Sequence, residues 1–130
     1  MDLAYFPFFA DIEGKKWLIA GGGEVACRKV RDLIPYGAVI QVVSPCLSQG
    51  LLDMEQRSVY GDALSVARRV FEDSDVEDAD FVIAATSDTA LNSHISSLCR
   101  MKQIPVNVVD VKEEWAELPK RISQSVGQMI

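Results

Sequence analysis

A glycine-rich hexapeptide has the clearest chemical meaning in this sequence. Residues 21–26 read GGGEVA, which fits the pattern G-x-G-x-x-G/A of phosphate-binding turns. In such a turn Gly21 allows a tight reversal, Gly23 lets the backbone approach a pyrophosphate, and Ala26 lets the following helix pack closely on the preceding strand. Free N–H groups at the start of that helix favour an anion. The hexapeptide therefore predicts a cradle for the phosphates of a dinucleotide.

A second contact with a dinucleotide is expected at the end of the next strand, about 20 residues further on. An acidic residue commonly binds the ribose hydroxyls of the adenosine half there, but this chain has Ser44, Pro45 and Cys46. The Ser44 hydroxyl and the backbone of Pro45 and Cys46 can still contact the adenosine half. Because no arginine follows directly to pair with a 2′-phosphate, the sequence favours NAD, while the choice between NAD and NADP stays open.

Polar residues follow two more strand-like segments, and ligands of open parallel sheets bind outside the carboxyl ends of strands. Thr86 and Ser87 follow one apolar run, and we expect their hydroxyls to be available near the cofactor. Asp88 comes next and has the position of a helix N-cap. Asp110 ends another strand, where a carboxylate beside a nicotinamide can take a proton or orient a substrate nitrogen. The residues alone leave Asp110 open between this role and that of a cap or turn residue.

These positions depend on strand-like segments that alternate with helix-like ones, which is typical of α/β layering with a parallel sheet. Strands are expected at 17–20, 39–43, within 65–71, at 80–85 and at 105–109. Helices are expected at 24–34, 48–57 and 88–102. The acidic stretch 72–80 is expected to be an exposed connection or helix. The pattern predicts a Rossmann-type doubly wound parallel sheet with helices on both faces.

Composition limits the class of protein. The 130 residues are 48% hydrophobic, which is enough for one core and one domain over residues 1–130. The net charge of −6 makes nucleic acid and anionic membrane surfaces poor partners. The longest apolar runs, such as 81–85, fall far short of the roughly 20 residues of a bilayer span. Since Asp2, Asp11 and Glu13 also interrupt a signal-peptide pattern, we expect a cytoplasmic location.

The sequence gives no pattern of a metal site. Cys27, Cys46 and Cys99 are an odd number with no close pair, so free thiols are expected. His94 is the one histidine and falls in an expected helix, where it is interpreted as a surface or packed residue. No metal ligands are therefore predicted.

Several stretches in their order resemble one family, that of precorrin-2 dehydrogenase or the siroheme synthase N-terminal domain. Besides the glycine-rich hexapeptide they are YFPFF at 5–9, GKK at 14–16, RK at 28–29, AATSD at 84–88 and NVVD at 107–110. The resemblance implies NAD-dependent oxidation of precorrin-2 to sirohydrochlorin, in some members followed by insertion of ferrous iron. It also implies that Asp110, the aspartate of the last motif, takes part in catalysis. The family's cofactor contacts correspond to Gly23, Glu24, Val25, Pro45 and Cys46.

The predicted cofactor contacts thus gather at three strand ends. They are Gly21, Gly22, Gly23, Glu24, Val25, Ser44, Pro45, Cys46, Thr86 and Ser87.

The chain departs from the resembled family after Asp110. Family members usually continue into a segment with Phe and Pro, strands that build a dimer, and a small helical domain that helps enclose the tetrapyrrole. Here Leu118 and Pro119 are a faint echo of that segment, and residues 111–130 are interpreted as a divergent tail. A homodimer therefore stays open as the assembly.

Three functional hypotheses follow. The first is an oxidoreductase in which NAD accepts a hydride from precorrin-2 while Asp110 assists proton removal or orients the tetrapyrrole. The second is a non-catalytic or regulatory dinucleotide-binding module associated with tetrapyrrole biosynthesis. The third is ferrochelatase activity with Asp110 as the base, for which a lone His94 gives little support.

Overall fold

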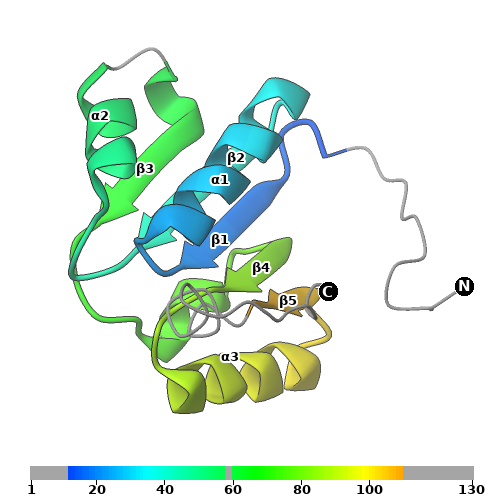
Figure 1. Ribbon diagram of the computed structural model, residues 1–130. Coiled ribbons are helices and arrows are strands. Elements are labelled where there is room, and N and C mark those ends of the chain that lie inside the picture. The colour runs from blue at the N-terminus through cyan, green and yellow to red at the C-terminus, as the bar shows by residue number, and fades with distance from the viewer. Residues whose placement is uncertain (1–11, 58–59, 110–130) are drawn as a thin grey trace, which may run out of the picture.

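The computed structural model describes residues 12–57 and 60–109, which form a five-stranded sheet flanked by helices (Figure 1). The strands are β1 (Lys16–Ala20), β2 (Val39–Val43), β3 (Leu64–Ala67), β4 (Phe81–Ala84) and β5 (Val106–Val108). Their order in the sheet is β3-β2-β1-β4-β5, and every neighbouring pair is parallel. This confirms the prediction of an α/β sheet of the Rossmann type.

The direction of strand addition reverses at β1. The chain builds β2 and β3 outward on one side of β1 and then returns to its other side for β4 and β5. Leu18 of β1 consequently lies between Gln41 of β2 and Val82 of β4. In open parallel sheets the ligand crevice forms outside the carboxyl ends of the strands at such a reversal.

Within the described ranges, helices cover both faces of the sheet. They are α1 (Glu24–Leu33), η2 (Ile34–Tyr36), α2 (Gln49–Arg57), η3 (Gly61–Ala63), η4 (Asp73–Val76) and α3 (Thr89–Met101), where η marks a 3₁₀ helix. α1 and α2 pack on one face, called the α1 face below, and α3 and η4 pack on the other, called the α3 face. Helices on both faces explain why the central strands are apolar without alternation.

Each face has its own core, because successive residues of a strand point to opposite sides. Ile19 packs with Val30 on the α1 face, whereas Leu18 packs with Ile95 and Val76 on the α3 face. All five side chains are at most 2% exposed.

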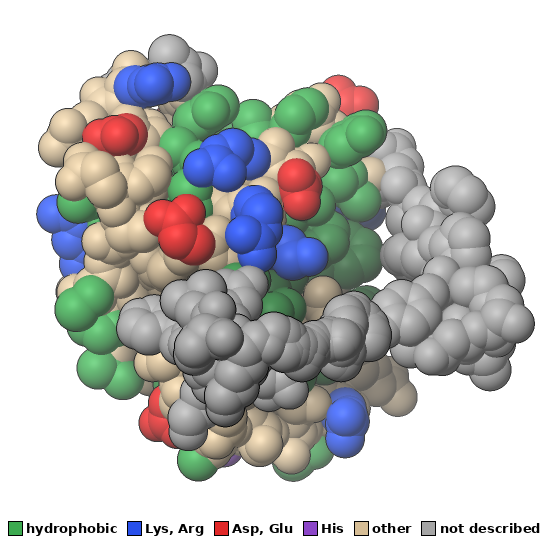
Figure 2. Space-filling model, viewed as in Figure 1, with side chains coloured by type: hydrophobic (Ala, Val, Ile, Leu, Met, Phe, Trp, Pro, Cys, Tyr) green, Lys and Arg blue, Asp and Glu red, His purple; other side chains and the backbone are tan. Residues whose placement is uncertain are grey.

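α1 is amphipathic. Its buried residues are Val25, Ala26, Cys27 and Val30. Its exposed residues carry both signs of charge, and Figure 2 shows basic and acidic side chains interspersed over this helix: Glu24, Arg28, Arg31 and Asp32. The visible face therefore presents a mixed surface.

The predicted elements match the observed ones closely. The strands expected at 17–20, 39–43, 80–85 and 105–109, and the helices expected at 24–34, 48–57 and 88–102, agree to within one residue at each end. α1 ends at Leu33 because Pro35 has no N–H to continue it, and Gly37 then reverses the chain with a φ of 83°. The third strand, expected within 65–71, is β3, which begins one residue before that range at Leu64 and ends at Ala67.

An ion pair between Arg69 and Asp75 holds the acidic connection between β3 and β4. The guanidinium of Arg69 donates to both carboxylate oxygens of Asp75, at 2.6 and 2.9 Å, and the Glu72 N–H donates to the same carboxylate at 2.8 Å. The Arg69 hydrogen bond is the largest cause that holds the pKa of Asp75 below its ordinary value. The pair fixes the loop that inserts fully buried Val76 into the α3 face.

Two predictions fall outside the described residues. The single domain over residues 1–130 and the divergent tail 111–130 both include segments that the structure does not describe, so they stay predictions. Among the described helices, none combines the length and the apolar composition that crossing a bilayer requires.

Candidate dinucleotide-binding site

Two glycines of the turn after β1 are required by close backbone contacts. Gly21 has a φ of +131°, and a Cβ added there would lie 2.3 Å from the Ala85 carbonyl oxygen. A Cβ on Gly22 would lie 2.0 Å from the Cys46 carbonyl oxygen and 2.7 Å from the Ser44 hydroxyl oxygen. These two residues therefore bring the ends of β1, β2 and β4 into direct contact.

Gly23, in contrast, is not required by any close contact with the described protein atoms. A Cβ added there meets no heavy atom of the protein within 4 Å, and its φ of −93° is accessible to any residue. Packing thus does not demand glycine at this position, but a ligand that approaches the backbone does. The open space beside Gly23 is where the hexapeptide predicts the phosphate cradle.

The start of α1 faces this cradle without a cap. Gly23 is the N-cap residue, and no side chain of the described residues caps the helix. The first N–H groups of a helix have no partner within the helix, and together they form its positive end. Val25 is 2% exposed, and its side chain packs in the core of the α1 face. The exposed carboxylate of Glu24 lies in the first turn, where it favours the helix dipole.

The turn after β2 packs against the glycines and uses its own hydroxyl. Ser44, 8% exposed, donates from Oγ to the Cys46 carbonyl at 2.7 Å and accepts from the Cys46 N–H at 3.3 Å. The Ser48 N–H donates to the Gly22 carbonyl at 2.7 Å. Because the single Ser44 proton is used, this hydroxyl can serve a ribose only as an acceptor. Pro45 and Cys46 are exposed beside it.

The loop after β4 is fixed by a residue that the sequence interpretation missed. Asn92 of α3 is 3% exposed, and its Oδ1 accepts from the Thr86 N–H at 3.1 Å and from the Thr86 hydroxyl at 2.7 Å. Its Nδ2 donates to the Thr86 carbonyl at 3.0 Å. The expectation of an available Thr86 hydroxyl is therefore wrong, because Asn92 already binds it. Ser87 is exposed at the same loop.

The N-cap assignment of Asp88 is confirmed. Its Oδ1 accepts from the Ala90 N–H at 3.0 Å and from the Leu91 N–H at 3.2 Å. Asp88 therefore starts α3 and so places Asn92, one turn further on, beneath the loop.

Asp110 lies outside the described residues. The residue before it, Val109, donates its N–H to the Ala84 carbonyl at 2.9 Å, so the described chain ends at the carboxyl edge of β4. The role of Asp110 stays a prediction.

The remaining polar groups take no part in the cradle. His94 is exposed on α3, with Nε2 at 2.7 Å from a carboxylate oxygen of Asp73. The three cysteines are free thiols, and burial raises the pKa of Cys27 and of Cys99. In the described part of the chain, no cluster of three or more His, Cys, Asp or Glu residues could hold a metal ion.

Comparison with known proteins agrees with this geometry. Residues 8–116 match a family model described as putative NAD(P)-binding. The siroheme synthase of Nitrosospira multiformis is 42% identical over 106 residues, which cover 82% of this chain and 22% of that protein. The siroheme synthase of Thioalkalivibrio sulfidiphilus is 45% identical over 109 residues, 84% of this chain and 22% of that protein. The chain thus spans about a fifth of the length of these relatives.

A solved structure shares the fold. SirC, a precorrin-2 dehydrogenase, superposes with a TM-score of 0.65 at 23% identity, over 93% of this chain and 53% of that one. The matches in sequence and in fold confirm the resemblance found in the motifs. The chain belongs to the family described as putative NAD(P)-binding, whose model it matches over residues 8–116.

Proposed function

We propose that this chain binds NAD and acts in the oxidation of precorrin-2 to sirohydrochlorin. The observation that carries the proposal is the open, uncapped helix start at Gly23, set where the ends of β1, β2 and β4 meet. The family of the chain supports the same cofactor. When bound, NAD supplies the hydride acceptor that an oxidation of this kind needs.

Different residues of the chain contact different parts of NAD in this proposal. The N–H groups of Glu24 and Val25 hold the pyrophosphate, and the turn from Ser44 to Cys46 contacts the adenosine half. The loop of Thr86 and Ser87 lies on the other side of the glycine turn, toward the nicotinamide. The backbone contact of Gly21 with Ala85 supports this division, because it sets the two loops side by side.

Asp110 is the proposed catalytic residue. It follows Val109, which pairs with the end of β4, and a carboxylate next to the reacting carbon can accept the proton that leaves with the hydride or orient a pyrrole nitrogen. Insertion of ferrous iron, with the same carboxylate as base, is a secondary proposal.

A second candidate is a module that binds the dinucleotide without turnover. It is supported by the matching family model, whose description concerns dinucleotide binding alone. A cytoplasmic location and a homodimer also remain proposals.

Anaerobic turnover separates the two candidates. The purified chain is incubated with precorrin-2 and NAD while NADH absorbance and the sirohydrochlorin spectrum are followed. Asp110→Asn should abolish turnover and leave NAD affinity, measured by calorimetry, within twofold. Asp62→Asn, which alters an exposed carboxylate in η3, is the matched control and should keep both. NAD binding without any turnover by the wild-type chain would establish the module instead.

A further inference from the structure

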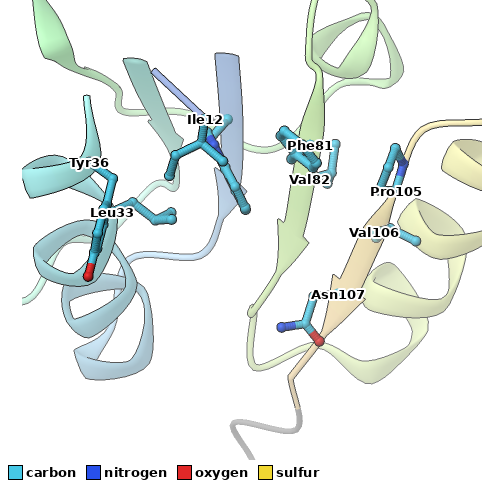
Figure 3. A pocket seen from close by; sticks show the side chains of 9 residues that line it. Ile12, Leu33, Tyr36, Phe81, Val82, Pro105, Val106 and Asn107 are labelled. Carbon is cyan, nitrogen blue, oxygen red and sulfur yellow. The ribbon is translucent and has the colours of Figure 1, made fainter. Parts of the chain in front are cut away.

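A cavity of about 390 Å³ opens at the amino edge of the sheet, opposite the dinucleotide cradle (Figure 3). Trp17 and Phe81, near the starts of β1 and β4, line its sheet side and stack with ring centroids 4.5 Å apart. Leu33 and Tyr36, at the end of α1 and in η2, face them across the cavity. The lining is almost entirely apolar, so the cavity suits an apolar occupant.

The described helices leave this part of the sheet uncovered. On the α1 face, the helix core is built by α1 and α2, and α2 contacts β3 at the far edge of the sheet. α3 contacts β4 and β5 but packs on the opposite face. The α1 face of β4 and β5 is therefore without a covering helix among residues 12–57 and 60–109.

One residue of the cavity lining has a hydrogen-bond donor without a partner among the described residues. Nε1 of Trp17 is buried and has no hydrogen-bond partner among the described residues. Buried indole N–H groups usually find an acceptor, because an unpaired one loses its bond to water without replacement. Because this nitrogen is itself inaccessible, the cavity selects its occupant through apolar contacts, and a peptide segment rich in aromatic residues supplies them.

We propose that residues 5–9 of this chain, the segment YFPFF, occupy the cavity. Ile12 lines the cavity and follows Phe9 by three residues, so Phe9 lies within about 11 Å of it at full extension. The segment has four aromatic side chains and no charge. Pro7 favours an extended backbone for itself and for the residue before it.

Residues 110–130 suit the cavity less well. They follow Val109, whose N–H pairs with the Ala84 carbonyl at the carboxyl edge of the sheet, whereas the cavity lies at the amino edge. Around their one tryptophan, Trp115, they carry Lys112, Glu113 and Glu114, and burial of these charges in an apolar cavity would be costly.

Quenching of tryptophan fluorescence tests the proposal in the full chain. In a Trp115→Phe background Trp17 is the single tryptophan, and the variant Phe6→Ser/Phe8→Ser/Phe9→Ser removes three of the four aromatic side chains of the segment. We expect the acrylamide quenching constant of Trp17 to rise at least threefold and its emission to shift to longer wavelength. The control variant Val126→Ser/Met129→Ser/Ile130→Ser should leave both unchanged. The NAD dissociation constant should stay within twofold in both variants, because the cradle lies at the other edge.

Three results would overturn the proposal. One is an unchanged Trp17 quenching constant in the variant with serines at positions 6, 8 and 9. Another is an equal rise of this constant in the control variant. The third is a Trp17 quenching constant that changes with protein concentration in the chain with the unsubstituted segment, in parallel with self-association seen by sedimentation. A second copy of the chain would then occupy the cavity. If the serine variant does not fold, nuclear Overhauser effects from the Trp17 indole proton decide. Contacts to protons of residues 5–9 support the proposal, and their absence in assigned spectra refutes it.

Discussion

The amide side chain of Asn92 holds the backbone and hydroxyl of Thr86 through three hydrogen bonds, at 2.7, 3.0 and 3.1 Å. The oxygen of Asn92 accepts from the N–H and the hydroxyl of Thr86, and its nitrogen donates to the Thr86 carbonyl. Thr86 in turn lies against the glycine turn, since its nitrogen is 3.2 Å from the site of a Cβ on Gly21. Asn92 thus positions the loop after β4 beside the glycine turn.

Replacement of Asn92 by Leu should weaken both folding and cofactor binding. The change leaves the Thr86 N–H and carbonyl without these partners, which costs about 1–3 kcal/mol in unfolding free energy. NAD affinity should fall with it, because the loop beside Gly21 is released. Urea unfolding and calorimetry measure the two effects. Ser93→Leu, at an exposed position on the same helix, is the control, and equal losses in both variants would remove the role assigned to Asn92.

Gly23→Ser should separate stability from binding. Serine is a preferred N-cap, and its hydroxyl accepts from the helix N–H groups that a pyrophosphate would use. Because a Cβ at this position meets nothing within 4 Å, we expect the unfolding free energy to stay equal or to rise by up to about 1 kcal/mol. The NAD dissociation constant should rise about tenfold or more, equivalent to about 1.4 kcal/mol per tenfold.

Gly22→Ala provides the contrast to that variant. Its methyl would lie 2.0 Å from the Cys46 carbonyl oxygen, so it should destabilise the fold by about 1–3 kcal/mol through overpacking.

If Gly23→Ser bound NAD as tightly as the wild type, the assignment of the cradle would be wrong.

Cys46→Arg should shift the cofactor preference toward NADP. Cys46 is exposed at the end of the turn after β2, where an arginine can pair with a 2′-phosphate. The ratio of the NADP to the NAD dissociation constant, measured by fluorescence titration, should fall at least fivefold. Gln56→Arg adds the same charge at an exposed site on α2 and should leave the ratio unchanged. An equal shift in both variants would mean that net charge alone is responsible.

The contribution of Asp75 to stability should disappear in acid. Its pKa in the folded chain is lowered from the ordinary value of 3.8, first by the Arg69 hydrogen bond. A carboxyl with a depressed pKa stabilises the fold fully above its unfolded value, and this stability is lost as the pH falls through the folded pKa. The difference in unfolding free energy between the wild type and Asp75→Asn should therefore be constant at pH 5–7 and shrink below about pH 3.8. Asp62→Asn should show no such pH-dependent difference, and a difference for Asp75→Asn that stayed undiminished down to about pH 2.5 would contradict the assignment.

Local patterns were sufficient to predict most of the fold. Apolar runs bounded by Gly, Pro and polar residues mark β1, β2 and β4, because strands covered on both faces lack alternation. Asp88 was identified as a cap from its place before an apolar helical pattern, and its hydrogen bonds confirm it.

The details that pattern could not supply are contacts between distant segments. The need for glycine at position 22 comes from the carbonyl of Cys46, on a strand that the hexapeptide does not include. Asn92 is a polar residue on a helix, and only its burial beneath Thr86 reveals its function. The same contact takes up the Thr86 hydroxyl, which the sequence left available for the cofactor.

The central position of β1 has a consequence for how the chain loses its cofactor. β1 pairs with β2 on one side and with β4 on the other, and the turn that forms the cradle is its direct continuation. A partly melted form that kept half of the sheet would therefore have only one wall of the crevice. Affinity for the dinucleotide and cooperative unfolding are thus coupled through a single strand, and bound ligand should raise the melting temperature of the whole described domain rather than of one half.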